Sequence, residues 1–447
     1  MTGRGVFHWY RETDGQTRRV FWTCLTAWGL DAVDGLTYQY LIPLIVAGLG
    51  LTLSQAGEVA GVNYFASALG GWLGGWLCDR VGRARILQVT ILWFSVFSGL
   101  SGFATSFHQL LAVRALQGLG FGAEWAVGAV LLGELIKPQH RGRALGTVHS
   151  AAAIGSGVAA LLAGPIAAAI GPAYGWRAVF WIGTLPALLI LFVRRGDDDS
   201  EIYKESRRAR AQAPSVTAIF GRAHLGVTAA AALLAIGAQG AGYAVSNYLT
   251  TFLQHERGLS PSLAGYYVLM NSAGGFAGFM INGALADRLG RRLTFRLFAI
   301  GFVLAVLLYL YAPLGGAGPA LAVCGFIYGA FQFGIYASFG PFFTELFPTE
   351  LRGAGQAFAY NSGRALSFIF IQGVAILAGH LALSLSMMTM GMVGATCAFV
   401  ATFLLPETAG RDLRRVGHPD FSRSESDDAQ RYQTAGTARP GTAGPAR

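Results

Sequence analysis

Long apolar segments separated by short charged loops dominate this sequence of 447 residues. A helix needs about 20 apolar residues to cross the hydrocarbon core of a bilayer. Only 13% of the residues are charged and the mean hydropathy is +0.47, whereas a soluble domain carries about twice that share of charge. Because a spanning helix satisfies its own backbone hydrogen bonds, the pattern predicts an all-α, polytopic membrane protein.

Twelve segments are predicted as transmembrane helices, in two groups of six, near residues 20–47, 57–77, 86–104, 108–135, 144–170, 177–193, 224–253, 262–285, 294–313, 318–346, 355–379 and 381–404. The longest internal polar stretch, 194–223, separates the two groups. We therefore expect an N-terminal bundle at 20–193, a cytoplasmic linker and a C-terminal bundle at 224–404. A polar segment, 1–19, precedes them, and the composition of the tail, 405–447, is typical of disorder.

Lysine and arginine are concentrated in alternate loops between the predicted spans. The net charge is +10, but the basic residues do not gather along one helix face, which argues against a nucleic-acid-binding surface. Cytoplasmic loops of membrane proteins carry the excess of Lys and Arg. The loops on one side, together with both termini, hold nearly all of the 33 basic residues. We therefore expect both termini in the cytoplasm and the lipid bilayer as the surrounding partner.

Two charged motifs each occur twice, once in each half of the chain. GWLCDRVGRAR (75–85) recurs as GALADRLGRRL (283–293), and ELIKPQHRG (134–142) recurs as ELFPTELRG (345–353). Both pairs are offset by nearly the same number of residues, which indicates a duplicated six-helix unit. Two such bundles related by pseudo-symmetry, with a substrate site between them, form a transporter architecture.

The loops at 75–85 and 283–293 resemble the signature loop of the major facilitator superfamily. Other segments are similar to its organic-acid branches, which carry sialate, metabolites or aromatic acids with protons: RALQGLGFGAEW (114–125), GWRAVFWIGTLPALL (175–189), ELFPTELRGAGQAFAYNSGR (345–364) and PETAGRDL (406–413). One departure is DAVD (31–34), where the aromatic-acid branch has Asp-Gly-Phe-Asp.

The resemblance implies a secondary active transporter that takes up a small organic anion, such as a sugar acid or an aromatic acid, with a proton by alternating access. It implies a carrier rather than an enzyme, without cofactor or metal, acting as a monomer in a bacterial-type inner (plasma) membrane. AGPIAAAIG (163–171) partly matches a motif of drug:proton antiporters. Proton-driven efflux of a hydrophobic compound is therefore the alternative function.

By the same resemblance, the duplicated charged loops form a conformational latch between the two bundles on the cytoplasmic side. Anchoring to anionic lipid is the alternative role. The latch residues expected on this basis are Asp79, Arg80, Arg83, Glu134, Arg141, Asp287, Arg288, Arg291, Glu345 and Arg352.

Ionisable residues inside predicted spans are candidates for proton coupling, because burying charge in a membrane is costly and usually functional. Asp31 and Asp34 share a helix face, and Arg114, Gln117 and Glu124 form a stripe on another helix. Asp34 and Arg114 lie at similar depth, so protonation of the carboxylate can free the guanidinium for an anion. Asp31 is the alternative titrating group. A purely structural ion pair, and a gating role for Glu124, also remain open.

Either Arg364 or Arg114 is expected to hold the substrate carboxylate, because a guanidinium binds carboxylates through two hydrogen bonds. Further polar and aromatic residues recur at helical spacing, where they either line a cavity or join neighbouring helices. The other predicted substrate-binding residues are Asn361, Gln117, Tyr243, Asn247, Gln332 and Tyr336.

Overall fold

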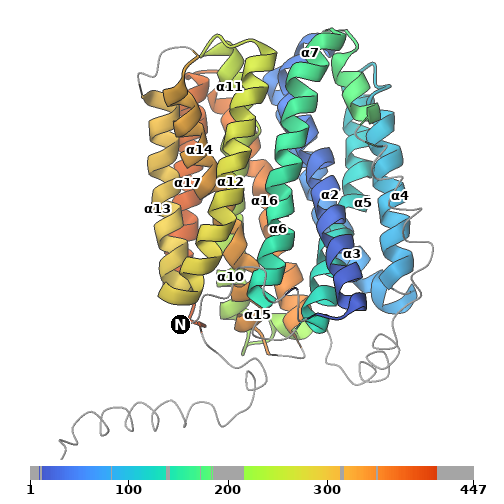
Figure 1. The fold of residues 1–447 in the computed structure, drawn as a ribbon, viewed down its shortest axis with the longest axis vertical. Helices are drawn as coiled ribbons and strands as arrows, with labels where there is room; N and C mark the ends of the chain where they lie inside the picture. Colours follow the sequence, from blue (N-terminus) through green and yellow to red (C-terminus); the bar gives the residue numbers. More distant parts are fainter. Residues whose placement is uncertain are drawn as a thin grey trace, which may run out of the picture.

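The computed structural model describes residues 10, 13–81, 83–136, 141–171, 173–182, 184, 216–312, 317–348 and 351–409. Every regular element within these ranges is a helix, which confirms the predicted all-α fold. Figure 1 shows the long helices running nearly parallel in one bundle, with α7 and α11 at one end and α15 at the other. We call the end with α7 and α11 the distal end.

The helices of the N-terminal half follow the predicted spans closely. They are α2 (Gly15–Leu49), α3 (Leu53–Val81), α4 (Arg83–Ser101), α5 (Phe107–Leu135) and α6 (Arg141–Leu161), which continues through a π-helical turn, η2 (Leu162–Ile166), into α7 (Ala167–Ile170). Residues 175–182 are also helical, within the sixth predicted span; residues 185–193 of that span lie outside the described ranges.

The C-terminal half contains two spans that are interrupted. After a short 3-10 helix, η4 (Val216–Phe220), come α10 (Leu225–Ser246) with α11 (Leu249–His255), α12 (Pro261–Leu289), α13 (Arg291–Tyr311), α14 (Pro319–Gly334) with η5 (Ile335–Ser338) and α15 (Phe339–Leu346), α16 (Arg352–Leu377) and α17 (Leu383–Leu404). Every predicted span thus contains a helix. Seven helical segments of the described chain are long and apolar enough to cross a membrane. Most of the predicted linker and the tail beyond residue 409 lie outside the description, so those domain boundaries stay predictions.

The two halves meet along two seams, where α3 packs against α16 and α6 packs against α12. Figure 1 shows α6 and α12 side by side along most of their length. At the distal end of this seam the backbones nearly touch: a Cβ atom on Gly265 would lie 2.8 Å from the carbonyl oxygen of Ala160 and 2.9 Å from the Cα of Gly164. Only glycine permits so close an approach.

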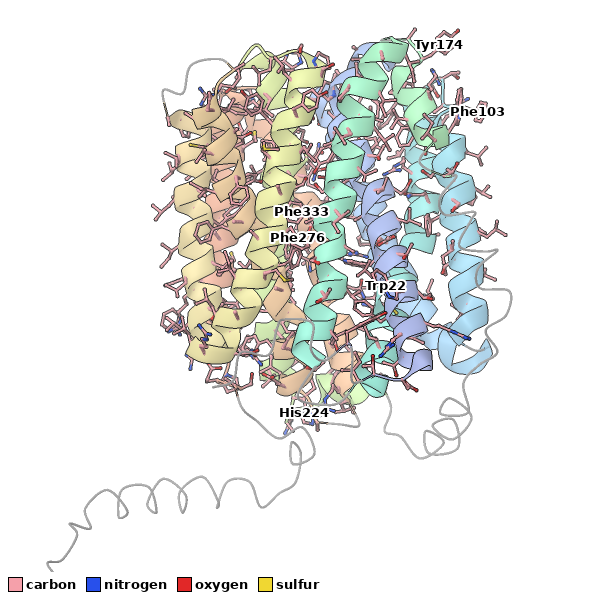
Figure 2. The ribbon with its side chains drawn as sticks, in the orientation of Figure 1. Trp22, Phe103, Tyr174, His224, Phe276 and Phe333 are labelled. Atoms are coloured by element: carbon pink, nitrogen blue, oxygen red, sulfur yellow. The ribbon has the colours of Figure 1, made fainter. Side chains whose placement is uncertain are left out.

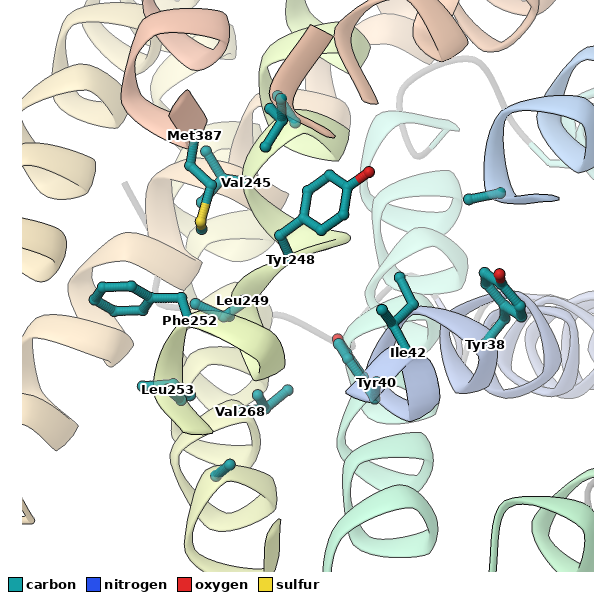
Figure 3. Close-up of a cluster of buried hydrophobic side chains, with 14 of the residues drawn as sticks. Tyr38, Tyr40, Ile42, Val245, Tyr248, Leu249, Phe252, Leu253, Val268 and Met387 are labelled. Carbon is teal, nitrogen blue, oxygen red and sulfur yellow. The ribbon is translucent and has the colours of Figure 1, made fainter. Parts of the chain in front are cut away.

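A cluster of buried aromatic and aliphatic side chains closes the distal end between the halves. Figure 3 shows Tyr38, Tyr40 and Ile42 of α2 lying opposite Tyr248 and Leu249 at the α10–α11 junction. All these side chains are at most 4% exposed. Their packing joins the two halves at this end of the bundle.

Two arginines near the distal end stabilise the ends of helices. Arg177 donates hydrogen bonds to the carbonyl oxygens of Gly102 and Ala104, just after α4. Arg257 donates to three carbonyls at the end of α13, those of Tyr309, Leu310 and Ala312. Terminal carbonyls of a helix have no partner within the helix, and a nearby cation also complements the helix dipole.

The second copy of the duplicated motif forms an ion-pair cluster at the start of α13. Arg291 pairs with Asp287 at 2.8 Å and with Glu345 of α15 at 3.0 Å. Glu407, which follows α17, accepts hydrogen bonds from the backbone N–H groups of Arg291 and Arg292. Gly290, at φ +90°, lies against this carboxylate, so a side chain there would be strained and crowded. The cluster therefore ties together helices of a single half.

A larger residue at Gly265 should prevent the distal end from closing. In Gly265→Val the added carbons meet the backbone of α6 and η2, which cannot move aside like a side chain. Overpacking of ~1–3 kcal/mol corresponds to roughly a 5- to 150-fold shift in the conformational equilibrium. We expect faster labelling of Ser272→Cys by a membrane-impermeant maleimide, in a background without other cysteines.

Gly283→Val is the matched control on the same helix, because a Cβ atom there meets nothing within 4 Å. Equal labelling rates in the Gly265 variant and this control would contradict the assigned role of the glycine contact.

Replacing Glu407 should destabilise the C-terminal half in a pH-dependent way. Burial opposes ionisation of this carboxyl, but the backbone N–H groups of Arg291, Ala409, Arg292 and Thr408 hold its pKa below the 4.5 that is ordinary for a glutamate. Its stabilising contribution is therefore complete above the ordinary pKa and is lost as the pH falls through the lowered one.

We expect Glu407→Gln to lower the melting temperature of the detergent-purified protein at pH 7, reflecting about 1 kcal/mol. The difference from the unmodified protein should shrink under acid conditions. Glu58→Gln, at an exposed position on α3, serves as the control. A difference in melting temperature that does not change with pH would rule out the charge as its cause.

Candidate functional site

A cavity lies between the two halves, in the middle part of the bundle. The space between its walls is about 730 Å³, counting the open solvent at its mouth. Phe333, one of its lining residues, is labelled near mid-height of the bundle in Figure 2. The lining residues are Trp28, Asp31, Ala32, Gly35, Leu36, Tyr64, His149, Ala152, Gln239, Tyr243, Phe279, Phe333, Tyr336, Tyr360 and Arg364.

Arg364 brings a buried guanidinium to this cavity from α16. The residue is 3% exposed, and its Nη1 donates to the hydroxyl of Ser67 on α3 at 3.1 Å. The guanidinium carbon lies 5.4 Å from the centre of the Tyr360 ring, within the range of a cation–π interaction. The side chain is thus held at the α3–α16 seam, with the cavity beside it.

Asp31 contributes a carboxyl group to the cavity from the opposite half. The residue is 2% exposed on α2, and its charge interacts with that of Arg364. Among the lining residues, these two are the only members of the Asp, Glu, Lys and Arg group. The cavity therefore contains one acidic and one strongly basic group, supplied by different halves of the protein.

Asp34 lies outside the cavity lining, in a polar network within the N-terminal half. Its carboxylate accepts hydrogen bonds from Ser98 and Gln117. The Asn63 amide donates one hydrogen bond to the side-chain oxygen of Gln117 at 2.5 Å and another to the backbone oxygen of Arg114 at 2.7 Å. The network thus joins α2, α3, α4 and α5 in the interior of one half.

Arg114 is 1% exposed and lies beside two aromatic rings rather than in a direct ion pair. Its guanidinium carbon is 4.9 Å from the Tyr38 ring centre and 5.6 Å from that of Phe180. The charges of Asp34 and Arg114 interact, but among the described residues no ion pair within 4.0 Å joins them. The Nε and Nη1 atoms of Arg114 have no hydrogen-bond partner in this part of the chain. The two groups are close in the fold without being in contact.

The predicted polar stripes divide between the cavity and helix contacts. Tyr243 and Tyr336 line the cavity, and the Tyr243 ring stacks on Tyr64 of the other half at 4.4 Å. Gln332 lies instead at a smaller pocket beside Ala238 and Phe302.

Three other predicted substrate residues bond to the protein itself. Asn247 donates to the carbonyl of Tyr243, and Gln117 donates to Asp34. Asn361 donates to the carbonyl of Ala357 and packs against Gly71 of α3. None of the three belongs to the lining of the cavity.

Most of the aromatic wall was not predicted from the sequence. Tyr64, Phe279 and Phe333 come from three different helices and share no spacing along the chain, and His149 is the single histidine of α6. A helical stripe predicts which residues of one helix share a face. It gives no signal for residues that several helices bring together.

The expected latch is only partly within the described side chains. Six predicted side chains lie outside the description: those of Asp79, Arg80, Arg83, Glu134 and Arg141, and that of Glu124. In the second copy of the first motif, Arg291 forms ion pairs within its own half and Arg288 is exposed. In the second copy of the other motif, Arg352 donates a hydrogen bond to the carbonyl of Thr344 at 2.8 Å.

Hydrogen bonds between the halves reinforce the closed distal end. The Thr250 hydroxyl donates to the carbonyl of Gln39 at 3.3 Å, and Gln372 donates to Ser54 at 2.7 Å. On the other seam, Ser156 bonds to Ser272 at 2.7 Å. The AGPIAAAIG segment begins at this seam and forms η2 and α7, so its residues do not line the cavity.

Two helical bundles that enclose a central, charge-containing cavity define the class of membrane transporters. Within that class, a model of the Major Facilitator Superfamily matches residues 23–372, and the chain belongs to this superfamily. The resemblance seen in the duplicated motifs is therefore confirmed. The protein is a multi-pass membrane transporter and not an enzyme.

Several curated proteins are similar over most of this chain. A probable 4-methylmuconolactone transporter of Cupriavidus pinatubonensis is 38% identical over 415 residues, which cover 93% of this chain and 96% of the relative. The cis,cis-muconate transport protein of Acinetobacter baylyi is 28% identical, covering 85% and 92%. A sialic acid transporter of Escherichia coli is 26% identical, covering 79% and 86%.

Solved structures share the fold at lower sequence identity. The crystal structure of a D-xylose-proton symporter has a TM-score of 0.69 at 18% identity, covering 88% of this chain and 99% of that one. An inward-open xylose transporter of Escherichia coli has a TM-score of 0.70 at 17% identity, covering 90% and 99%. These similarities establish the twelve-helix, two-bundle architecture.

Proposed function

We propose that this protein takes up a small, ring-containing or unsaturated organic acid together with a proton. The proposal rests on one observation: Arg364 and Asp31 both line a cavity whose walls are largely aromatic. The names of the similar proteins, which include a muconolactone and a muconate transporter, support an organic acid as the substrate.

The lining favours a flat, weakly polar anion. Arg364 can hold a carboxylate through two parallel hydrogen bonds, while the faces and edges of Tyr64, Tyr243, Tyr336 and Tyr360 can pack against a planar carbon skeleton. A polyhydroxylated sugar acid would need several hydrogen-bonding partners, and among the lining residues aromatic groups predominate.

Proton coupling follows if Arg364 must always have a negative partner when the cavity is closed. Removing one member of a buried ion pair costs about 3–5 kcal/mol. With neither proton nor substrate bound, Asp31 is the partner of Arg364; with both bound, the substrate carboxylate replaces a neutral Asp31. The two half-loaded states each leave one buried charge uncompensated. Only the empty and the fully loaded carrier then change conformation readily, so one proton moves with each carboxylate.

Asp34 and Arg114 support a second version of the same mechanism. Their network lies near the cavity, but the hydrogen bonds of the Asp34 carboxylate come from Ser98 and Gln117 of the same half. In this version Asp34 would titrate and its change of charge would act on Arg114. Glu124 and the duplicated charged loops keep the gating and latch roles proposed from the sequence. Exchange of Asp31 and Asp34 for asparagine distinguishes the two versions.

Direction of transport distinguishes uptake from the alternative, efflux of a hydrophobic compound. The efflux motif contributes to the seam and not to the cavity lining, which favours uptake. In right-side-out vesicles an inward proton gradient should drive accumulation of labelled organic acid. Accumulation that ignores the gradient would refute symport, and gradient-driven extrusion would favour the antiporter.

Arg364→Lys should abolish high-affinity binding of the carboxylate. Lysine keeps the charge but loses the planar pair of donors. Truncation of a buried charged contact costs at least about 2 kcal/mol, so we expect KM to rise at least roughly 30-fold in proteoliposomes, with unchanged amounts of folded protein. Arg222→Lys, at an exposed position, is the control. An unchanged KM in Arg364→Lys would remove this residue from the site.

Asp31→Asn should uncouple transport from the proton gradient. Asparagine resembles the protonated carboxyl, so substrate binding and exchange of labelled for unlabelled acid should persist, while uphill accumulation should disappear. The matched variant is Asp34→Asn. Loss of accumulation only in Asp34→Asn would assign the titrating role to Asp34, and full accumulation in both variants would reject both carboxylates.

A further inference from the structure

The cavity has polar groups at both of the seams that join the two halves. Arg364 lies at the α3–α16 seam, where it bonds to Ser67. His149 lies at the α6–α12 seam, with its ring centre 6.2 Å from that of Phe279 on α12. Both residues line the same cavity. The cavity therefore extends from one seam to the other, with a guanidinium at one boundary and an imidazole at the other.

The imidazole of His149 is held in place by an aromatic neighbour. Its ring centre lies 5.7 Å from that of Trp28, with the two planes inclined by 34°. The residue is 5% exposed, so its conformation is fixed by packing. A histidine side chain can donate one hydrogen bond and accept another, a capacity that the apolar neighbours Ala152 and Phe279 do not have.

We propose that His149 determines substrate specificity by hydrogen-bonding an uncharged oxygen, a hydroxyl or carbonyl, at the end of the substrate opposite its carboxylate. This inference rests on the proposed function, because Arg364 must hold the carboxylate for the other end to reach His149. The substrate class is then a ring-containing monocarboxylate with a second, neutral oxygen group.

The charges around His149 favour a neutral group over a second carboxylate. Arg364 is the one Arg or Lys among the lining residues, and it is already used by the first carboxylate. Asp31 lines the same cavity and would repel a second negative charge. A dicarboxylate would thus bury an anion without a cation, which is costly.

Binding of three acids that differ only at the far end of one ring tests the proposal. The probes are benzoate, 4-hydroxybenzoate and terephthalate, measured with the purified full-length protein. A hydrogen bond contributes about 0.5–1.5 kcal/mol, so we expect 4-hydroxybenzoate to bind up to roughly tenfold more tightly than benzoate. Terephthalate should bind more weakly than 4-hydroxybenzoate.

The His149→Phe variant should lose the preference for the hydroxyl group. Its affinity for benzoate should remain within about twofold, because an aromatic ring still packs against Trp28. His149→Gln should keep part of the preference, since an amide also donates and accepts; it tests the proposal even if His149→Phe does not fold. His108→Phe, at an exposed position, is the control.

Arg364→Gln separates this proposal from the one on which it rests. It should weaken binding of both benzoate and 4-hydroxybenzoate, because both acids lose the contact with their carboxylate. If the folded His149 variants keep the full preference while Arg364→Gln still weakens both acids, the role of His149 is wrong and the proposed function stands. If the unmodified protein binds none of the three acids, the role of His149 is wrong, and the vesicle assay decides the proposed function.

Discussion

Close backbone contact between the two halves holds them together at the distal end and shapes the cavity between them. At the distal end, Gly164 and Gly265 let α6 and α12 approach so closely that a single added carbon would meet backbone atoms. Serine and threonine hydroxyls bridge the halves nearby. Lipid tails are as apolar as the helix side chains, so the hydrophobic effect contributes little to helix association. Close packing at small residues and interhelical hydrogen bonds stabilise the contact instead. The halves pack along the α3–α16 and α6–α12 seams and at the distal cluster, and the space between these contacts remains as the cavity.

The electrostatics of the cavity depend on its being shared between the halves. Asp31 comes from α2 and Arg364 from α16, so any motion that separates the halves also changes how well their charges compensate each other. Asp34 and Arg114 differ in this respect, because both lie in the N-terminal half. The charge interaction of Asp31 with Arg364 depends on how far apart the halves lie, whereas that of Asp34 with Arg114 is contained within one half.

The sequence predicted the architecture well because hydrophobicity and charge act locally. Span positions and the duplicated unit follow from those two patterns. The rule that buried charge is costly also led to Asp31 and Arg364, which line the cavity, and the i, i+4 stripes led to Tyr243 and Tyr336. The same spacing selected Asn247, which bonds within its own helix. Spacing defines a face of a helix but not the neighbour that covers it. Trp28 and His149 meet only because α2 packs on α6, so no local pattern predicted them.

The π-helical turn at Leu162–Ile166 has a consequence for everything that follows it along the chain. Such a turn holds one residue more than an α-helical turn, and one residue corresponds to about 100° of rotation about the helix axis. Pro165, which has no N–H to donate, lies within this wider turn. This one additional residue therefore determines how α7 is rotated about its axis. The rotation in turn affects the direction of the chain toward Trp176 and Arg177.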